Sequence, residues 1–202
     1  VAEIHPGESS TRVLELLHRL RPAVLVTGRD PLLFSGLGLP VFDDEMIDAA
    51  AARDGGPEAL PVEDFDPALI VFTSGSTGLP KGVMLGHAGF TAVLESILDV
   101  LPLAADEKYS LVLPLCHTYG LSVLLTTLHA GGAVHLDSFT DLPRYVGSLA
   151  TRRITAFSGV PYHAQLLLRR GSLDRHDLSA LRWFTISGGP MPPGDLEDLA
   201  SR

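Results

Sequence analysis

The sequence predicts an α/β fold in which a mainly parallel β-sheet is covered by helices on both faces. Two observations support this class. Short, continuous apolar runs of strand length recur along the chain, and from residue 69 onwards a helical stretch follows each run. Strands that alternate with helices are joined by crossover connections, which make neighbouring strands parallel. With 202 residues, the chain can bury a core between such layers.

The first part of the chain is less regular. Apolar residues at helical spacing predict a helix over Ser10–Leu20, and a short buried strand follows at Ala23–Thr27. A weaker strand at Val41–Phe42 precedes a helix at Glu45–Ala52. The segment Arg53–Pro67 is rich in glycine, proline and acidic residues, so we expect a surface loop there.

From residue 69 the alternation is regular. The predicted strands are Leu69–Phe72, Ser110–Leu113, Ala133–Leu136, Thr155–Ser158 and Trp183–Ile186. The predicted helices are His87–Val100, Gly120–Ala130, Leu142–Arg152, Tyr162–Arg169 and Gly194–Ala200. Ligands of parallel sheets bind beyond the carboxyl ends of the strands. Three unusual loops of this sequence fall there, so we expect the functional site at that edge.

The composition argues against some classes of protein. A formal charge of −9, with basic residues scattered along the chain, disfavours a nucleic-acid-binding surface. Cys116 is the only cysteine, so no intrachain disulfide can form and a reducing compartment is expected. No apolar run approaches the ~20 residues that cross a bilayer, and the first residues lack a signal-peptide pattern. We therefore expect a cytoplasmic protein without a membrane span.

The strongest motif follows the predicted strand Leu69–Phe72. Four hydroxyls, three glycines and one lysine occupy ten consecutive residues: Thr73, Ser74, Gly75, Ser76, Thr77, Gly78, Leu79, Pro80, Lys81 and Gly82. Glycines let backbone N–H groups turn towards an anion, hydroxyls add donors, and lysine supplies a mobile positive charge. This combination suits a polyphosphate. A flexible surface turn is the simpler alternative, but a flexible linker rarely follows a buried strand and ends in Pro-Lys-Gly.

Two other phosphate-loop or catalytic motifs do not match this sequence. A Walker loop needs glycine directly before its lysine and serine or threonine after it, whereas Pro80 precedes Lys81 and Gly82 follows it. A hydrolase nucleophile elbow needs Gly-x-Ser-x-Gly, and neither Ser74 nor Ser76 has glycine on both sides at that spacing.

The loop resembles the phosphate-binding signature of the adenylate-forming (AMP-binding) superfamily. This superfamily contains acyl- and aryl-CoA synthetases, luciferases and the adenylation domains of nonribosomal peptide synthetases. The resemblance implies that the phosphates of ATP are bound by Thr73, Ser74, Gly75, Ser76, Thr77, Gly78 and Lys81. One small departure lies downstream, where Gly86 replaces the hydroxyl residue that precedes the family's histidine, here His87.

The segment Pro114–Leu121 resembles the family's Pro-Leu-Phe-His-x-x-Gly. The resemblance implies that His117 lies where the acid's carboxylate meets the α-phosphate, and that Tyr119 and Gly120 border the acyl pocket. Cys116 replaces the usual Phe, and we interpret it as a residue that shapes the pocket and not as a nucleophile. Amino-acid-activating members carry an aspartate near this position. No aspartate occurs between Asp106 and Asp137, which favours an acid without an α-amino group.

Two further segments resemble family landmarks in the family's order. Ser187–Met191 is similar to the stretch whose backbone packs against adenine, which implies nucleotide contacts by Gly188, Gly189 and Pro190. Gly159–Pro161 is similar to a stretch that forms a wall of the acyl pocket, which implies that Val160 and Pro161 lie there. A tight turn would explain either segment alone, but their joint occurrence with the phosphate loop is much more specific.

The resemblance as a whole implies that residues 1–202 form a single partial domain, the central part of a large N-terminal adenylation domain without the mobile C-terminal domain. The intact enzyme would be an acid–thiol ligase, which forms an acyl-adenylate from ATP and a carboxylic acid and then a thioester. Lys81 and His117 would be its catalytic residues within this chain.

The implied cofactors are ATP, Mg²⁺ and CoA or phosphopantetheine, and an acyl carrier protein is a conceivable partner. The Mg²⁺-binding glutamate is expected beyond residue 202, so no metal ligand is assigned within this chain, and the fragment alone is expected to be inactive. Three alternatives stay open: a noncatalytic nucleotide- or acyl-binding module, an amino-acid-activating domain, and an unrelated phosphate-binding α/β enzyme.

Overall fold

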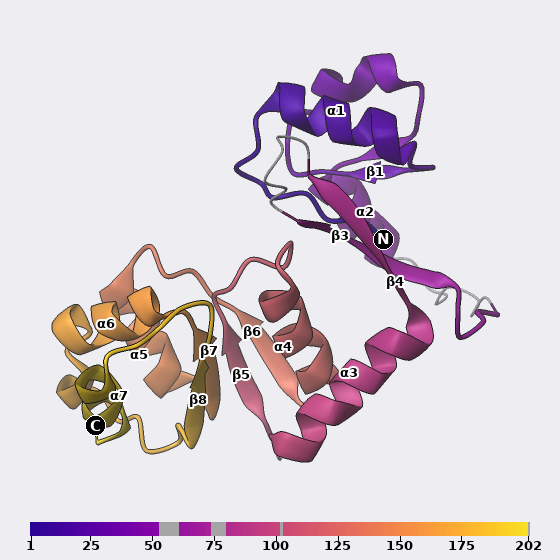
Figure 1. Cartoon of the computed structure of the whole chain (residues 1–202). Coiled ribbons are helices and arrows are strands. Elements are labelled where there is room, and N and C mark those ends of the chain that lie inside the picture. The colour runs from indigo at the N-terminus through magenta and orange to yellow at the C-terminus, as the bar shows by residue number, and fades with distance from the viewer. Residues whose placement is uncertain (53–60, 74–79, 102, 202) are drawn as a thin grey trace. The chain divides into compact units, whose positions relative to one another are not determined.

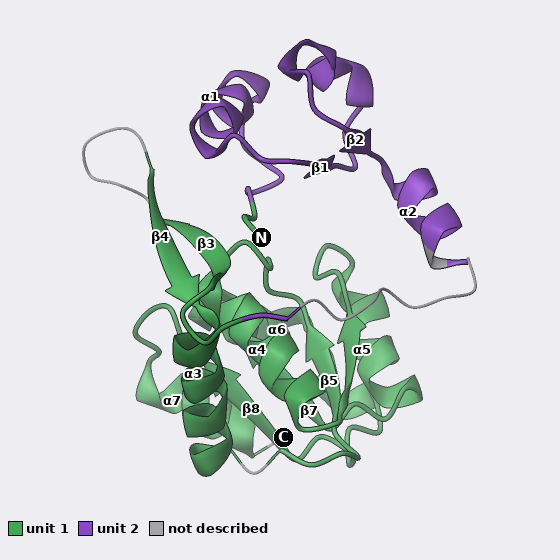
Figure 2. Ribbon diagram, turned by 90° about the vertical axis from the view of Figure 1, so that its right-hand side faces the viewer, with its two compact units in different colours: residues 1–3, 63–202 green, residues 4–62 purple. Residues whose placement is uncertain are grey.

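A computed structural model of the chain describes residues 1–52, 61–73, 80–101 and 103–201 (Figure 1). The chain divides into two compact units (Figure 2). One unit comprises Val1–Glu3 and Glu63–Arg202, and the other comprises Ile4–Val62. They are the large unit and the small unit, respectively.

The small unit pairs helices with two very short parallel strands. Its elements are α1 (Ser10–Leu20), β1 (Leu25–Val26), the 3-10 helix η1 (Pro31–Leu37), β2 (Val41–Phe42) and α2 (Asp44–Ala51). The predicted helix over 10–20 is confirmed, and the Ser9 hydroxyl accepts a hydrogen bond from the backbone N–H of Arg12 at 3.2 Å. Its apolar face packs on Phe34 through Val13 and Leu17, and this contact forms the core of the unit.

The large unit is built on a four-stranded parallel sheet with the order β6-β5-β7-β8. The strands are β5 (Lys108–Leu111), β6 (Ala133–Leu136), β7 (Ala156–Gly159) and β8 (Trp183–Ile186). The helices are α4 (Thr118–His129), α5 (Leu142–Thr151), α6 (Pro161–Arg170) and α7 (Pro193–Ala200), and η2 is a short 3-10 turn at Leu173–Arg175. Helix α4 covers one face of the sheet, and α5 and α6 cover the other (Figure 1). The predicted α/β class with a parallel sheet is confirmed.

One predicted strand does not join this sheet. The apolar run at 69–72 forms part of β3 (Pro67–Thr73), which pairs antiparallel with β4 (Lys81–Gly86) in a separate two-stranded sheet. The sequence pattern does not predict β4, because the segment Lys-Gly-Val-Met-Leu-Gly contains two glycines, which weaken a strand pattern. Most of β4 is exposed, so its backbone hydrogen bonds to β3, and not burial, define it as a strand. Helix α3 (His87–Val100) follows directly.

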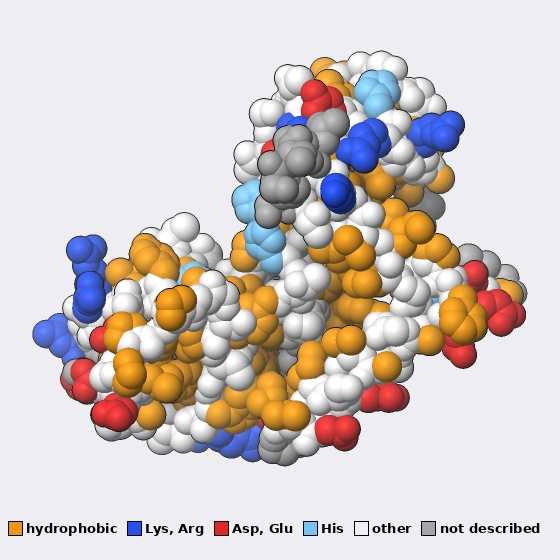
Figure 3. Space-filling view, viewed as in Figure 1, with side chains coloured by type: hydrophobic (Ala, Val, Ile, Leu, Met, Phe, Trp, Pro, Cys, Tyr) orange, Lys and Arg blue, Asp and Glu red, His pale blue; other side chains and the backbone are white. Residues whose placement is uncertain are grey.

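The main core of the large unit lies between the sheet and helices α5 and α6. Tyr145, Val146 and Leu149 of α5 pack with Phe157 of β7 and Leu167 of α6. These side chains repeat at helical spacing on α5, which is why the sequence predicted this helix correctly. Large apolar side chains also remain exposed elsewhere in the unit, and Figure 3 shows apolar side chains gathered on one face.

A buried carboxylate holds the amino ends of three strands together. Glu107 is only 1% exposed and accepts a hydrogen bond from the guanidinium of Arg182 at 2.8 Å and another from the hydroxyl of Thr155. These residues directly precede β5, β8 and β7, respectively. The hydrogen bonds to Glu107 give its buried charge the partners that it needs. They also hold the strands together at their amino ends, which is the edge opposite the expected site.

Candidate nucleotide and acid site

The two described ends of the phosphate loop meet in the β3–β4 pair. Thr73 ends β3 and Lys81 begins β4, and the two residues lie directly opposite each other in the antiparallel ladder. Both are exposed, and the Thr73 hydroxyl donates to the backbone carbonyl of Lys81 at 3.4 Å. The remaining predicted phosphate ligands, Ser74, Gly75, Ser76, Thr77 and Gly78, lie outside the described residues.

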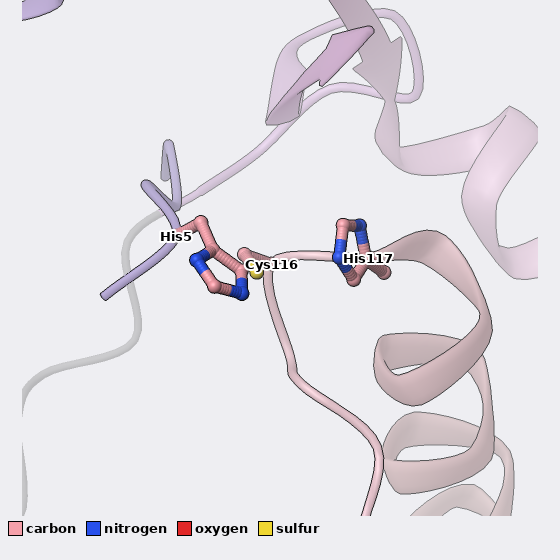
Figure 4. Close-up of side chains that lie close together, drawn as sticks. All are labelled: His5, Cys116 and His117. Carbon is pink, nitrogen blue, oxygen red and sulfur yellow. The ribbon is translucent and has the colours of Figure 1, made fainter. Parts of the chain in front are cut away.

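The predicted histidine lies at the start of α4. His117 occupies the position before the first helical residue, in extended conformation, and its side chain is exposed. Its backbone N–H donates to the carbonyl of Pro114 at 3.2 Å, which curls the loop into the helix. Figure 4 shows Cys116 and His117 on this loop. Burial raises the pKa of the Cys116 thiol, so the thiolate is disfavoured and a role as nucleophile is not supported.

Gly120 allows the loop to lie against the helix. A Cβ atom at this position would come within 2.5 Å of the carbonyl oxygen of Pro114 and 3.1 Å of Leu113. The nearest of these atoms, the carbonyl oxygen of Pro114, belongs to the backbone, which cannot move aside as a flexible side chain would. A glycine is therefore needed for the close approach that positions His117 and Tyr119.

A chain of buried and half-buried hydroxyls ties α4 to three strands. The phenol of Tyr119 donates to the carbonyl of Thr185 in β8 at 3.0 Å and lies 2.9 Å from the Thr185 hydroxyl. That hydroxyl lies 2.6 Å from the Ser158 hydroxyl in β7, which in turn lies 2.7 Å from the phenol of Tyr109 in β5. Burial raises the pKa of Tyr109 to about 12, so this phenol stays protonated and can donate.

The two segments that begin at Gly159 and Ser187 are adjacent in space. The backbone N–H of Ser187 donates to the carbonyl of Gly159 at 3.1 Å. Gly188 has a φ of +87°, a conformation that favours glycine, and a Cβ atom there would lie 3.3 Å from Val160. A Cβ atom on Gly189 would lie 3.7 Å from the ring of Pro161. The structure therefore brings together two segments that are separated by more than twenty residues.

His163, which belongs to none of the sequence motifs, holds the Gly159–Pro161 turn. The backbone N–H of Val160 donates to Nδ1 of His163 at 3.3 Å, which requires an unprotonated Nδ1. The imidazole also stacks on Phe139, with ring centroids 4.6 Å apart. Burial lowers the pKa of His163, so the neutral form that accepts this hydrogen bond is favoured.

A cavity of about 210 Å³ lies along α4 and reaches β8. It is lined by Ile97, Leu101, Leu103, Tyr109, Tyr119, Ser122, Val123, Thr126, Thr127, Thr185, Ile186 and Ser187. Of the residues predicted for the acid pocket, Tyr119 lines this cavity directly, and Ser187 precedes the predicted adenine segment. The lining contains hydroxyls and apolar groups, and no carboxylate or ammonium group of the described residues contributes to it.

No sequence motif indicates most of this lining, although part of the signal is present in the sequence. Tyr119, Val123 and Thr126 recur at helical spacing, so they fall on one face of the predicted helix. Thr185 and Tyr109 carry no such signal, because only the order of the strands places them beside α4.

A larger cavity of about 1080 Å³ lies on the α5–α6 face. Asp137, Asp141 and Arg170 are among the residues that line it, together with Tyr162 and His163. None of the predicted site residues lines this cavity. The smaller cavity is therefore the better candidate for the acid, since it touches both the α4 landmark and the segment at the end of β8.

These segments lie where the strands of the parallel sheet end, which is the expected edge for ligands. Gly159 ends β7, Ser187 directly follows β8, and Pro114 comes shortly after β5. The family match agrees with this arrangement, since residues 9–202 match the family described as AMP-binding enzyme. The chain belongs to the AMP-binding enzyme family.

Relatives of this AMP-binding chain include a feruloyl-CoA synthase and 4-coumarate–CoA ligases. It is 39% identical over 152 residues to a feruloyl-CoA synthase from an Amycolatopsis species, which covers 75% of this chain and 30% of that protein. It is 34% identical over 154 residues to 4-coumarate–CoA ligase 2 from Oryza sativa subsp. japonica, which covers 74% of this chain and 27% of that protein. The AMP-binding chain thus spans about 30% of the length of these relatives.

A solved structure shows the same fold. The complex of VinN with L-aspartate superimposes with a TM-score of 0.85 and 26% identity, over 99% of this AMP-binding chain and 52% of that chain. Among the described residues, no helix is both long and apolar enough to cross a membrane.

Proposed function

We propose that the protein containing this chain activates an aromatic carboxylic acid with ATP and transfers the acyl group to CoA. The observation that carries this proposal is the convergence of Tyr119, Thr185 and Ser187 on one cavity at the carboxyl ends of the strands. The two relatives above, a feruloyl-CoA synthase and a 4-coumarate–CoA ligase, support both the acid class and CoA as acceptor.

The cavity suits the organic part of such an acid. Its volume of about 210 Å³ exceeds the ~150 Å³ of an apolar cavity that binds benzene, so a substituted ring can be accommodated. Apolar walls from α3 and α4 would cover the ring faces, and the hydroxyls could bind polar substituents. The absence of a carboxylate in its described lining agrees with an acid that carries no ammonium group there.

In the proposed reaction a carboxylate oxygen of the acid attacks the α-phosphorus of ATP, and the bond to the leaving pyrophosphate breaks. The thiol of CoA then attacks the acyl carbonyl, and AMP leaves. Lys81 would stabilise the negative charge on the phosphates, together with Thr73 and the Ser74–Gly78 segment. His117 would orient the carboxylate, and Gly188, Gly189 and Pro190 would contact adenine.

The described residues fit a polyphosphate at the hairpin. Thr73 and Lys81 are exposed and opposed, so a hydroxyl donor and a cation flank the place where the loop leaves and re-enters the sheet. Magnesium accompanies ATP in the proposal and would supply further charge neutralisation when bound. Val160 and Pro161, which lie next to Gly188 and Gly189, would form a wall of the site.

The test is acid-dependent exchange of pyrophosphate into ATP, measured on the full-length protein with a panel of acids. The panel should contain ferulate, 4-coumarate, benzoate, octanoate and L-aspartate, followed by assay of CoA thioester formation. We expect the aromatic acids to give the highest kcat/KM. Exchange with none of these acids would contradict the proposal.

Activation of an amino acid is the second candidate, because the VinN structure contains L-aspartate. Against it, no aspartate lies between Asp106 and Asp137, the region where an ammonium-binding carboxylate is expected. L-aspartate as the best acid in the panel would favour this second candidate over the first.

A further inference from the structure

Ser158 is a fully buried residue of β7 that belongs to none of the sequence motifs. Its side chain is 0% exposed. The hydroxyl lies 2.7 Å from the phenol of Tyr109 in β5 and 2.6 Å from the hydroxyl of Thr185 in β8. Tyr109 and Thr185 both line the cavity of about 210 Å³, whereas Ser158 is not among the lining residues. Ser158 therefore links two residues of the cavity wall without lining the cavity itself.

The register of the sheet explains how one serine can reach both neighbours. Strand β7 lies between β5 and β8, with Ala156 opposite Tyr109 on one side and opposite Trp183 on the other. The rings of Tyr109 and Trp183 meet edge to face with centroids 5.4 Å apart, so they close over the small side chain of Ala156. Ser158 lies two residues further along β7, on the same face of the sheet, where the phenol of Tyr109 reaches it.

The hydrogens of this hydroxyl chain (Tyr109, Ser158, Thr185 and Tyr119) can be placed so that every contact carries one. Tyr119 donates to the backbone carbonyl of Thr185, which can only accept. Each hydroxyl has one hydrogen, so the hydroxyl of Thr185 donates to the phenol of Tyr119. By the same count, Ser158 donates to Thr185 and accepts from the phenol of Tyr109. The chain thus runs from Tyr109 to Tyr119, and Ser158 is its second link.

This order gives Ser158 an influence on Tyr119. Tyr119 is a half-buried residue in the first turn of α4, and it lines the cavity. Its phenol is bonded to the carbonyl and the hydroxyl of Thr185. A hydroxyl that accepts a hydrogen bond becomes a stronger donor, because bonds in a chain polarise one another. Loss of the Ser158 hydroxyl would therefore weaken the contact between Thr185 and Tyr119.

We propose that Ser158 is a positioning residue for the acid: through Thr185 it holds Tyr119 in place and so fixes the wall of the acid cavity. This inference rests on the proposed function, because it takes the cavity to be the acid pocket. Neither Thr73 nor Lys81 belongs to the hydroxyl chain, so phosphate binding should not depend on it.

The experiment is Ser158→Ala in the full-length protein, which removes the hydroxyl and little else. Pyrophosphate exchange is measured with the acid of the panel that the wild type activates best. KM for the acid should rise about fivefold, the factor that corresponds to one lost hydrogen bond. KM for ATP should stay within about twofold of the wild-type value, because uniform destabilisation of the enzyme does not separate the two substrates.

Ser110→Ala is the matched control. Ser110 in β5 is also 0% exposed, and its hydroxyl donates to a carboxylate oxygen of Asp137 at 2.8 Å and lies 3.1 Å from the phenol of Tyr145. Tyr145 belongs to α5, which covers the opposite face of the sheet from α4. Thermal unfolding should show that both variants are less stable than the wild type, but Ser110→Ala should leave KM for the acid unchanged.

A second pair of variants tests the route of the effect. If Ser158 acts through Tyr119, then Ser158→Ala should change KM for the acid by less than about twofold when Tyr119→Phe is already present. Thr185→Val removes the next hydroxyl and keeps the carbonyl, so it should reproduce the rise in KM, whereas Thr185→Ser should retain the wild-type value. This comparison also decides the proposal if Ser158→Ala yields no folded protein.

The outcomes separate this inference from the proposed function. An unchanged KM for the acid in active Ser158→Ala, or in Thr185→Val, would overturn the role of the hydroxyl chain. An equal rise in Ser110→Ala would also overturn it, and so would a full effect of Ser158→Ala in the Tyr119→Phe background. Failure of the wild type to activate any acid of the panel would overturn the proposed function, and this inference with it.

Discussion

The β3–β4 hairpin and the wall between α4 and β8 differ in how they encode their proposed roles. The hairpin carries a proposed phosphate loop made of ten consecutive residues, Thr73 to Gly82, whose chemistry is recognisable in the sequence. The wall combines Tyr119 with Thr185, which is 66 residues away in the sequence. The comparison teaches that a proposed anion site made of adjacent residues is recognisable in the sequence, whereas the proposed acid pocket is assembled from distant elements and is not.

The largest effect is expected in the hairpin. Lys81→Ala should lower kcat/KM for ATP about 100-fold in the full-length protein, because one preorganised charge is lost from a charged transition state. Pyrophosphate exchange at varied ATP concentration measures this effect. Lys108→Ala is the matched control, since the only other lysine lies at the start of β5 and its removal changes the net charge equally. Equal effects of the two variants would show that general charge matters and that the loop has no special role.

An intermediate effect is expected at the wall. Gly120→Ala should destabilise the fold by about 1–3 kcal/mol, because its new Cβ would collide with the backbone of Pro114. We expect KM for the acid to rise more than KM for ATP, since the loop that carries His117 must move. Denaturant unfolding and steady-state kinetics measure the two effects.

The control for this variant is another helical glycine. Gly89 in α3 has no atom within 4 Å of its would-be Cβ, so Gly89→Ala should leave stability unchanged or raise it by up to ~1 kcal/mol. If Gly120→Ala were as stable as Gly89→Ala, the close approach of Gly120 to the backbone of Pro114 would be contradicted.

The smallest effect is expected from pH at the Val160 turn. Burial lowers the pKa of His163 in the folded state, so folding favours the neutral ring. The stability from this ring is present above its ordinary pKa of about 6.5 and decreases as pH falls towards the lower folded pKa. The free energy of unfolding should therefore fall more between pH 7 and pH 5 in the wild type than in His163→Asn, whose amide oxygen can accept from Val160 without titrating. Parallel pH profiles would show that His163 does not contribute.

Much of the fold was accessible from the sequence. The helices at 10–20 and 87–100 and the strands at 133–136 and 183–186 have the predicted bounds, because their apolar spacing or continuous apolar character matches the periods of helices and strands. The strand β4 was missed, since its exposed side chains and glycines give no burial pattern. The pairing of β3 with β4 outside the parallel sheet is equally invisible, because an apolar run does not specify its partner strand.

The sequence by itself determined the class of the fold and the family resemblance, and it carries the motif from which the phosphate loop is predicted, because those properties depend on local spacing and on side chains that are adjacent in the chain. It also pointed to His117, Val160 and Gly188 as separate landmarks. Only the tertiary structure decided that Gly188 lies against Val160 and that Tyr119 is bonded to Thr185. Strand order and helix packing bring these groups together, and neither is written in the local pattern of the residues concerned.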